Sequence, residues 1–317
     1  MIFKKPKFWD EKKDLNFLAY FLLPFALLIK INNLFSNFLI KYKTKKIITI
    51  CVGNIYLGGT GKTPTVIKLF EIFKKLKLKS VVGKKFYKSH LDENTLLGKK
   101  TKLLLGDNRL QIIKKAIKRN EKFVIFDDGL QDKKIDYNLK FVCFDSLNWI
   151  GNGFLIPSGP LREDLSSLKK FDAVFLKNIK KKNYDVINSI KKINPKIKIF
   201  NSEYKIKNLK KFDLTKNYMI FSGIGNPKSF EKLLEKYKFK IISKIHFSDH
   251  YNYKRNDILK IIEKARKLDA KIITTEKDYV KVPKIYRKKI NFISVELEIE
   301  KIKNLINFIK LKINEQS

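Results

Sequence analysis

Apolar residues follow two alternating patterns along this chain, short β-rich runs and longer stretches with helical spacing. The short runs, rich in Ile, Val, Leu and Phe, predict strands. They lie at residues 47–52, 80–82, 102–105, 123–126, 141–144 and 173–177. Helical spacing over residues 63–78 and 108–118 predicts helices between some of them. Because strands alternate with helices, we expect an α/β fold with a mostly parallel sheet and helices on both faces.

A second α/β pattern follows a short, basic and extended stretch at residues 196–214, which we interpret as a strand hinge. Its predicted strands are residues 218–221, 241–245, 271–275 and 290–295, and its predicted helices end near residues 237, 268 and 311. The chain is therefore predicted to have an N-terminal helical segment (1–44), a core (45–200) and a smaller C-terminal α/β lobe (201–317). Two lobes joined by a hinge suit an enzyme that closes over a nucleotide.

The N-terminal segment contains an apolar run at residues 17–29, continued more loosely to residue 40. The uninterrupted run is shorter than the roughly 20 residues of a membrane-spanning helix, and no small-residue cleavage site follows it. Its apolar body, aromatic residues and flanking lysines favour an amphipathic helix in a membrane interface. A helix packed on the protein's own core and a single membrane span are the alternatives.

The stretch from Lys45 to Pro64 has the order of a phosphate-binding loop: an apolar strand, a glycine-rich turn, Lys-Thr and a helix. The turn and its flanks comprise Tyr56, Leu57, Gly58, Gly59, Thr60, Gly61, Lys62 and Thr63. Glycines let backbone N–H groups point at phosphate oxygens, and the helix N-terminus adds its positive dipole end. We expect Lys62 to reach the β- and γ-phosphates and Thr63 to ligate Mg²⁺. Tyr56 occupies the usual first glycine position, so the alternative is a turn that only joins strand to helix.

Acidic residues end two of the predicted strands, where ligands bind in open α/β sheets. Asp127 and Asp128 follow the run at 123–126, as in a Walker B segment, and one or the other is expected to hold Mg²⁺ directly or through water. Asp107 follows the run at 102–105. Taken alone, it would equally well cap the helix that begins near Asn108. A turn-capping role is likewise the alternative for the Asp127 pair.

Three histidines are present, His90, His246 and His250. His250 lies just past a predicted strand and beside Asp249, and a neighbouring carboxylate can hold an imidazole as a proton acceptor. Phosphoryl transfer to a hydroxyl needs a base near the acceptor oxygen, a role open to His250 or Asp107. An ordinary surface histidine is the alternative.

Composition narrows the possible classes of protein. The 317 residues are 44% hydrophobic, which excludes a disordered chain. Seventy Lys and Arg against 31 Asp and Glu give a net charge of +39. This charge fits an anionic membrane surface or acidic ligand, or a general lysine bias; without an Arg-rich arm, RNA-binding signature or zinc-finger spacing, no nucleic acid is expected. Cys51 and Cys143 lie in apolar runs, which indicates buried reduced thiols and a cytosolic compartment.

Seven segments together resemble the tetraacyldisaccharide 4'-kinases of lipid A synthesis. They are residues 52–64, Gly106-Asp107, 127–131, 151–163, 221–227, 248–250 and 274–278. The resemblance implies an ATP- and Mg²⁺-dependent kinase at the cytoplasmic face of the bacterial inner membrane. Its substrate would be the 4'-hydroxyl of a tetraacylated glucosamine disaccharide 1-phosphate, and its product a lipid IVA-type molecule. The implied fold is a P-loop core, a smaller C-terminal lobe on a strand hinge, and an N-terminal helix in peripheral contact with the anionic membrane.

The resemblance also implies roles for individual residues. Asp107 matches the catalytic aspartate and His250 its partner, and the two would together take the proton from the sugar hydroxyl. Glu163 matches an acid near the magnesium ion, and Arg162 would help to neutralise phosphate charge.

Two departures from the family pattern affect these assignments. The family usually carries Gly-Asp-Glu where this chain has Gly106-Asp107-Asn108, so a metal role for that glutamate is missing or moved. The family's Ser-Arg-Gly-Tyr-Gly-Gly segment is here Val-Gly-Lys-Lys-Phe-Tyr-Lys, at residues 82–88. The second change affects sugar recognition if that segment touches the substrate.

Two other classes of protein are alternatives to a lipid kinase. A P-loop ATPase acting on a membrane or DNA partner would release free phosphate, but partitioning ATPases carry a lysine where this chain has Leu57. A non-catalytic basic protein would bind no nucleotide and would dock with a steep salt dependence.

Overall fold

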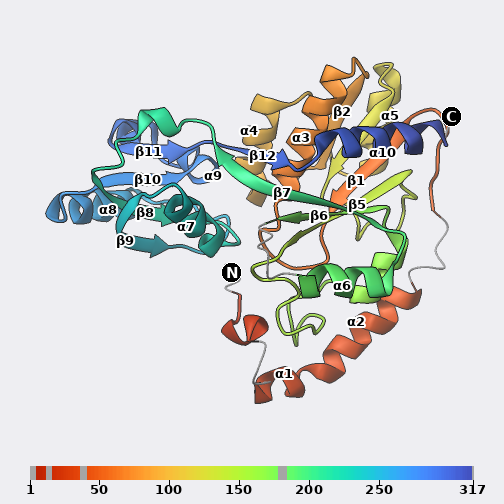
Figure 1. Cartoon of the computed structure of the whole chain (residues 1–317), viewed down its shortest axis with the longest axis horizontal. Helices are drawn as coiled ribbons and strands as arrows, with labels where there is room; N and C mark the ends of the chain where they lie inside the picture. Colours follow the sequence, from red (N-terminus) through yellow and green to blue (C-terminus); the bar gives the residue numbers. More distant parts are fainter. Residues whose placement is uncertain (1–4, 12–15, 36–40, 178–183, 316–317) are drawn as a thin grey trace. The chain divides into compact units, whose positions relative to one another are not determined.

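The computed structural model describes residues 5–11, 16–35, 41–177 and 184–315, which form two compact units. The larger unit comprises Lys5–Phe86, Leu97–Glu203 and Glu298–Ser317, and the smaller one contains Tyr87–Leu96 and Tyr204–Leu297. The predicted N-terminal segment lies partly outside the described residues, at 1–4, 12–15 and 36–40. Figure 1 shows the elements of each unit.

The larger unit is built on an eight-stranded sheet with the order β12-β7-β6-β5-β1-β4-β2-β3. Its strands are β1 (Ile48–Gly53), β2 (Ser80–Lys85), β3 (Leu103–Gly106), β4 (Phe123–Asp127), β5 (Leu139–Asp145), β6 (Ala173–Lys177), β7 (Lys198–Ile206) and β12 (Val295–Ile299). All neighbours from β7 to β3 are parallel. Val52 of β1 pairs with Asp127 of β4, so these two strands end side by side. The glycine-rich turn and the acidic pair therefore start from adjacent points.

Helices cover both faces of this sheet. They are α3 (Lys62–Lys75), α5 (Arg109–Lys118), α6 (Tyr184–Ile193) and α10 (Ile302–Asn314). On one face, Ile112 of α5 and Ile190 of α6 share a buried cluster with Phe126 of β4. On the other, Phe73 of α3 packs edge-on against Phe123, with ring centroids 5.1 Å apart. The predicted mostly parallel α/β class is confirmed.

Both cysteines lie in buried strands of this sheet, Cys51 in β1 and Cys143 in β5. Cys51 and Cys143 are both buried free thiols, as their apolar surroundings predicted. Burial raises the pKa of Cys143 to about 12, with opposing contributions from Thr65 and Lys62. Both thiols are therefore protonated packing groups.

The smaller unit holds a four-stranded parallel sheet with the order β11-β10-β8-β9. Its strands are β8 (Asn217–Ser222), β9 (Lys240–His246), β10 (Lys271–Thr275) and β11 (Ile290–Ile293). Helix α7 (Pro227–Lys236) packs into one buried cluster of this sheet, and α8 (Arg255–Lys267) packs into another. The short helix α9 (Glu276–Tyr279) begins where β10 ends.

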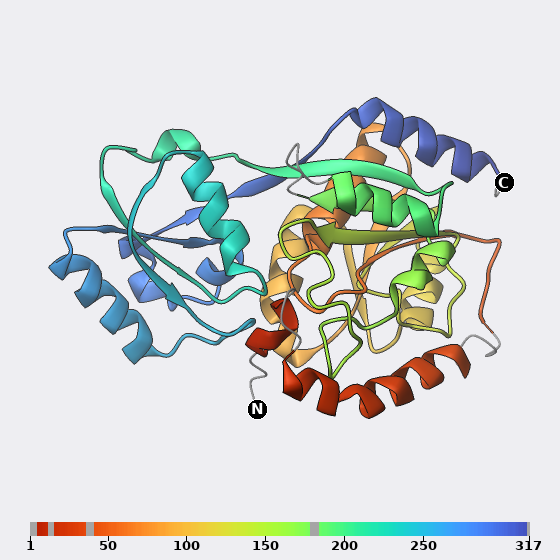
Figure 2. The ribbon, with the colours of Figure 1, turned by 60° about the horizontal axis from the view of Figure 1, so that its bottom comes forward.

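The N-terminal elements belong to the larger unit and pack in an unusual way. They are the 3₁₀ helix η1 (Lys7–Asp10), α1 (Phe17–Phe21) and α2 (Leu23–Phe35), and in both ribbon views α1 and α2 lie on the side of this unit opposite α10 (Figures 1 and 2). Their small residues Ala19 and Ala26 are buried, while large apolar residues such as Phe17, Leu28 and Phe35 are exposed. A helix that served only the core would bury its large apolar residues and expose its small ones. No helix within the described ranges has the length and apolar character needed to cross a bilayer.

Several elements differ from the sequence prediction. The single strand predicted at 290–295 is two strands, β11 and β12, and only residues up to Leu297 belong to the smaller unit. The predicted hinge at 196–214 contains β7, within which the chain passes from one unit to the other after Glu203. Helix α4 (Leu91–Lys100) was not predicted, and its first residues belong to the smaller unit. These first residues join the smaller unit because Asp92 contacts His250 and Lys277, which are distant from it in sequence.

Candidate active site

The glycine-rich turn after β1 has the backbone of an anion-binding loop. Gly58 has φ 149° and Gly61 has φ 92°, conformations that side chains disfavour, and Gly61 precedes the first residue of α3. Asn54 holds the loop from inside, because its Nδ2 donates to the carbonyl of Gly58 at 3.2 Å. The Lys62 ammonium donates to Asn54 Oδ1 at 3.0 Å and lies 3.3 Å from Asp128 Oδ2. Lys62 is thus held at the loop by groups that a phosphate can replace.

Tyr56, the residue in place of the usual glycine, joins this loop to a second segment. Its backbone forms an antiparallel bridge with Leu161, and the Arg162 N–H donates to the carbonyl of Ile55 at 2.7 Å. This pairing places the Leu-Arg-Glu segment along the loop. The Tyr56 hydroxyl donates to Asp10 of η1 at 2.8 Å, so the N-terminal elements are anchored to the same residue.

Asp127 has the environment expected of a magnesium ligand. Its Oδ2 accepts hydrogen bonds from Thr63 Oγ1 at 3.0 Å and Lys84 Nζ at 2.7 Å. Its Oδ1 is buried with no hydrogen-bond partner among the described residues. A buried carboxylate oxygen left without a donor, next to the hydroxyl of Thr63, matches the oxygen ligands that Mg²⁺ takes. The residues present therefore fit the cation.

The other predicted acids, Asp128 and Glu163, are also paired with cations. Asp128 lies 3.2 Å from Arg162 Nη1 as well as near Lys62. Burial opposes its ionisation, but the charges of Lys62 and Arg162 outweigh burial and hold the pKa of this carboxyl below its usual range. Glu163, itself buried, accepts from Gln131 Nε2 at 3.1 Å and lies 3.4 Å from Lys133. These acids order the cations around the loop.

His250 belongs to a separate cluster in the smaller unit. Its backbone N–H donates to the carbonyl of Gly223 at 3.2 Å, in the turn after β8. Its Nδ1 lies 3.1 Å from Asp92 Oδ1, and its Nε2 lies 3.3 Å from Lys277 Nζ. Because the ionised Asp92 only accepts and the ammonium only donates, these partners select the tautomer with the proton on Nδ1. Nε2 is then the acceptor nitrogen, and it faces the Lys277 ammonium.

Asp92 is an almost completely buried carboxylate whose charge is stabilised by several neighbours. Burial opposes its ionisation, but the hydrogen bond with His250 and the charge of Lys277 lower its pKa. Lys281 Nζ lies 3.6 Å from Asp92 and 2.8 Å from Asp278. Asp278 in turn accepts from the Gly223 N–H at 3.0 Å. The segments at 221–227 and 274–278 therefore position the imidazole and its carboxylate.

Asp107, the predicted partner of His250, lies in the larger unit. It is exposed, and the N-cap of α5 is Asn108, whose side chain accepts from the Gln111 N–H at 2.9 Å. The structure gives His250 a different carboxylate, Asp92, because residues 87–96 belong to the unit that contains the histidine. The pairing of Asp107 with His250 stays a prediction.

Sequence reasoning missed Asp92, Glu93, Lys84 and Lys277. The signal for the first two was an adjacent pair of acids, Asp92 and Glu93, in the first turn of α4. Lys84 had a signal in the altered segment at 82–88, where a lysine ends a buried strand beside the Walker B strand. Of the remaining histidines, His90 lies beside His250, whereas His246 pairs with Glu231 at 3.1 Å.

Comparison with known proteins connects this geometry to one family. The family described as tetraacyldisaccharide-1-P 4'-kinase matches residues 17–91 and 88–314. The tetraacyldisaccharide 4'-kinase of Pelagibacter ubique is 44% identical over the full length of both chains. That of Rickettsia typhi is 36% identical over 93% of this chain and 94% of its own. LpxK from Aquifex aeolicus, solved in complex with ATP, shares the fold, with a TM-score of 0.67 at 21% identity over 93% of this chain and 99% of its own.

The buried pair between Lys84 and Asp127 gives a prediction about stability. Replacing Lys84 with Met leaves the carboxylate buried without its cation, so we expect the free energy of unfolding to fall by about 3–5 kcal/mol. The double variant Lys84→Met/Asp127→Asn removes both charges and should recover most of that loss. Urea unfolding of the single and double variants measures the two free energies of unfolding. A double variant as unstable as Lys84→Met would contradict the view that Lys84 stabilises the protein by neutralising Asp127.

Proposed function

The chain belongs to the tetraacyldisaccharide-1-phosphate 4'-kinase family, and on that premise we propose that it transfers the γ-phosphate of ATP to the 4'-hydroxyl of an acylated glucosamine disaccharide 1-phosphate. This is a step of lipid A biosynthesis. The observation that carries the proposal is the arrangement of Lys62, Thr63 and Asp127 at the ends of β1 and β4. A phosphoryl-transfer enzyme needs these groups at the same sheet edge.

We assign the phosphate-binding roles from the contacts of each side chain. The loop amides around Gly59 and Gly61, with Lys62 and Arg162, would surround the phosphates of ATP. Asp128 acts by orienting both cations, since it contacts each of them. The positive groups are then fixed before the reaction, which lowers the cost of stabilising charge in the transition state.

Thr63 and Asp127 are the residues that we propose to hold Mg²⁺. Asp127 keeps a buried oxygen for the ion, whereas Asp128 is engaged by Lys62 and Arg162. Glu163 supports the same region through Gln131 and Lys133. When bound, Mg²⁺ supplies positive charge to the phosphate oxygens.

His250 is the proposed proton acceptor, and Asp92, in place of Asp107, is the carboxylate that holds it. With the proton on Nδ1 directed at Asp92, Nε2 can accept the proton of the sugar hydroxyl. The imidazolium that results is stabilised by the adjacent carboxylate. Lys277, which now lies at Nε2, would give way to the hydroxyl and keep Asp249 as a partner at 3.2 Å.

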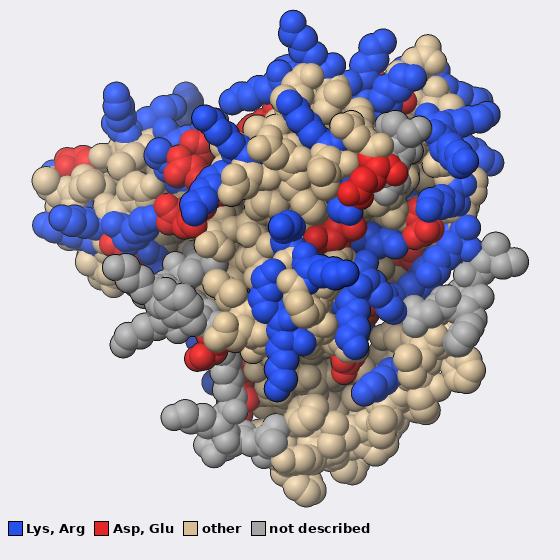
Figure 3. Space-filling view, turned by 45° about the vertical axis from the view of Figure 1, so that its right-hand side comes forward, with Lys and Arg blue, Asp and Glu red and all other residues tan. Residues whose placement is uncertain are grey.

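We also propose that α1 and α2 attach the protein to the cytoplasmic face of the inner membrane as a peripheral contact. Figure 3 shows an uncharged surface at the lower edge of the view, over these helices, with Lys and Arg side chains crowded above it. Exposed apolar residues enter the lipid interface, and cations attract anionic head groups. An acylated substrate lies in the same interface.

The experiment that tests the function incubates the chain with Mg²⁺, γ-labelled ATP and the acylated disaccharide 1-phosphate, and separates the lipid by chromatography. We expect the label on the lipid. Lys62→Ala should lower turnover about 10²- to 10³-fold, because one fixed positive group is lost from the transferred phosphate. Label found only in free phosphate would favour an ATPase acting on a membrane or DNA partner.

The same assay distinguishes Asp92 from Asp107. Asp92→Asn should lower kcat about 10²-fold or more, in the range of general-base catalysis, while Asp107→Asn should remain near wild type. Because Asp92 and His250 serve one proton transfer, Asp92→Asn/His250→Ala should be little worse than the worse single variant. A large loss for Asp107→Asn with a small loss for Asp92→Asn would reverse the assignment.

Membrane attachment is tested by placing charge on the exposed apolar face. Leu28→Glu should weaken sedimentation with anionic vesicles and leave the unfolding temperature unchanged, because Leu28 is 63% exposed. Leu311→Glu on α10, where the leucine is 57% exposed, is the matched control and should bind as the wild type does. Equal binding by all three proteins would argue for a helix that serves only the core.

A further inference from the structure

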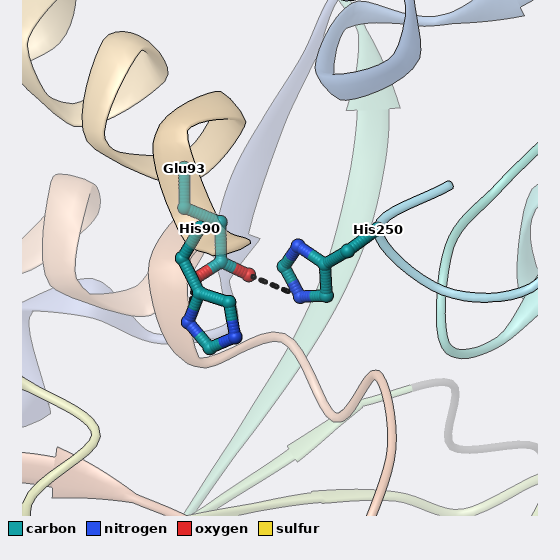
Figure 4. A group of neighbouring side chains, drawn as sticks. All are labelled: His90, Glu93 and His250. Carbon is teal, nitrogen blue, oxygen red and sulfur yellow. Dashed lines mark ion pairs between the residues drawn. The ribbon is translucent and has the colours of Figure 1, made fainter. Parts of the chain in front are cut away.

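Three potential metal ligands, His90, Glu93 and His250, lie together in the smaller unit (Figure 4). His90 comes from the 3₁₀ helix η3 (Lys88–His90), Glu93 from the first turn of α4, and His250 from the segment after β9. One ligand atom from each side chain can be chosen so that all lie within 4.8 Å of one another. His250 Nε2 is 3.6 Å from Glu93 Oε1, and His90 Nδ1 is 4.0 Å from Glu93 Oε2.

The donor set selects a particular kind of cation. Two imidazole nitrogens and one carboxylate suit late first-row ions such as Zn²⁺, whereas Mg²⁺ prefers oxygen ligands. Zn²⁺ binds nitrogen and oxygen at about 2.0–2.2 Å, so tetrahedral ligand atoms lie roughly 3.3 Å apart. The 3.6 Å between His250 Nε2 and Glu93 Oε1 is close to that value, and the full set of three ligand atoms lies within 4.8 Å. The His90 and His250 rings are stacked with an interplanar angle of 11°, so metal binding requires one ring to rotate until both nitrogens face the same ion.

The electrostatics of the cluster favour positive charge. The carboxylates of Asp92, Glu93 and Asp249 face two ammonium groups, Lys277 and Lys281, so a net negative charge remains when the imidazoles are neutral. The Lys277 ammonium lies 3.2 Å from both Glu93 Oε1 and Asp249 Oδ1, so the cluster already holds one cation.

A metal ion at this site would compete with the Lys277 ammonium for the same ligand atoms. Its Nζ lies 3.2 Å from Glu93 Oε1 and 3.3 Å from His250 Nε2, two of the three ligands. The displaced ammonium keeps other carboxylate partners, because Asp249 Oδ1 is 3.2 Å away and Asp92 Oδ2 is 3.9 Å away. A divalent ion bonded directly to three ligands can replace a single ammonium group here.

We propose that His90, Glu93 and His250 bind Zn²⁺ or a similar late first-row divalent cation, and that this binding inhibits the enzyme. Inhibition follows because the metal takes the electron pair of His250 Nε2, the proposed proton acceptor. The inhibitory half rests on the proposed function, whereas the binding half depends only on the cluster. The site is distinct from the magnesium ligands of the larger unit.

Metal binding is measured on the full chain by titrating Zn²⁺ against a chromophoric chelator and by the absorption spectrum of Co²⁺ in its place. We expect one ion per chain, and a loss of affinity of about 10-fold or more in His90→Gln, the scale on which metal sites respond to altered coordination. His246→Gln is the matched control, because this histidine pairs with Glu231 elsewhere in the unit. Lys277→Met should bind Zn²⁺ more tightly, since it removes the competing ammonium.

The activity arm uses saturating Mg²⁺ and ATP. Zn²⁺ should inhibit the wild type and His246→Gln, while His90→Gln keeps wild-type turnover and resists inhibition. Unchanged Zn²⁺ affinity in His90→Gln, or an equal loss in His246→Gln, would overturn the proposal. Zn²⁺ binding that depends on His90 in a protein that phosphorylates no lipid would defeat the proposed function alone. Lipid phosphorylation without Zn²⁺ binding would defeat this inference alone.

Discussion

The parallel pairing of β1 with β4 is the constraint from which the nucleotide site follows. Val52 and Asp127 are register partners, so the turn after one strand and the acids at the end of the other leave the sheet together. Burial then makes Asp127 depend on Lys84, since an ionised carboxylate inside the protein requires a cation. Among the described residues, the other oxygen of the same carboxylate has no donor. A structural ion pair and a buried oxygen without a partner thus coexist in one side chain.

Charge pairing organises the rest of the loop in the same way. Lys62 and Arg162 share Asp128, and Lys133 lies near Glu163. Each cation proposed to bind phosphate is thus held in position by a carboxylate before the phosphate arrives. The phosphate must then replace that carboxylate as the partner of the cation. Backbone pairing of Tyr56 with Leu161 brings the second of these segments to the first. A glycine at position 56 would lack the ring and hydroxyl that also anchor the N-terminal elements.

The smaller unit uses buried charge for a different purpose. Asp92 is held ionised by His250, Lys277 and Lys281, and Asp278 ties the last of these to the Gly223 turn. One imidazole nitrogen is fixed by this network and the other faces an ammonium. Both the proposed proton transfer and the proposed metal site use that second nitrogen. A single histidine, His250, therefore serves both the proposed catalysis and the proposed inhibition.

Local periodicity and short contiguous motifs were enough to predict the mostly parallel α/β fold and the family. For example, the strand predicted at 173–177 coincides with β6. The same motifs predict a phosphate-binding loop and a Walker B pair. The contacts between residues distant in sequence could be found only in the folded chain. Lys84 reaches Asp127 through neighbouring strands, and residues 87–96 join the unit that contains His250, although they lie far from it in sequence. Asp92 could not be singled out from the sequence, because a buried carboxylate beside an imidazole is defined by its surroundings in space, which a linear pattern does not contain.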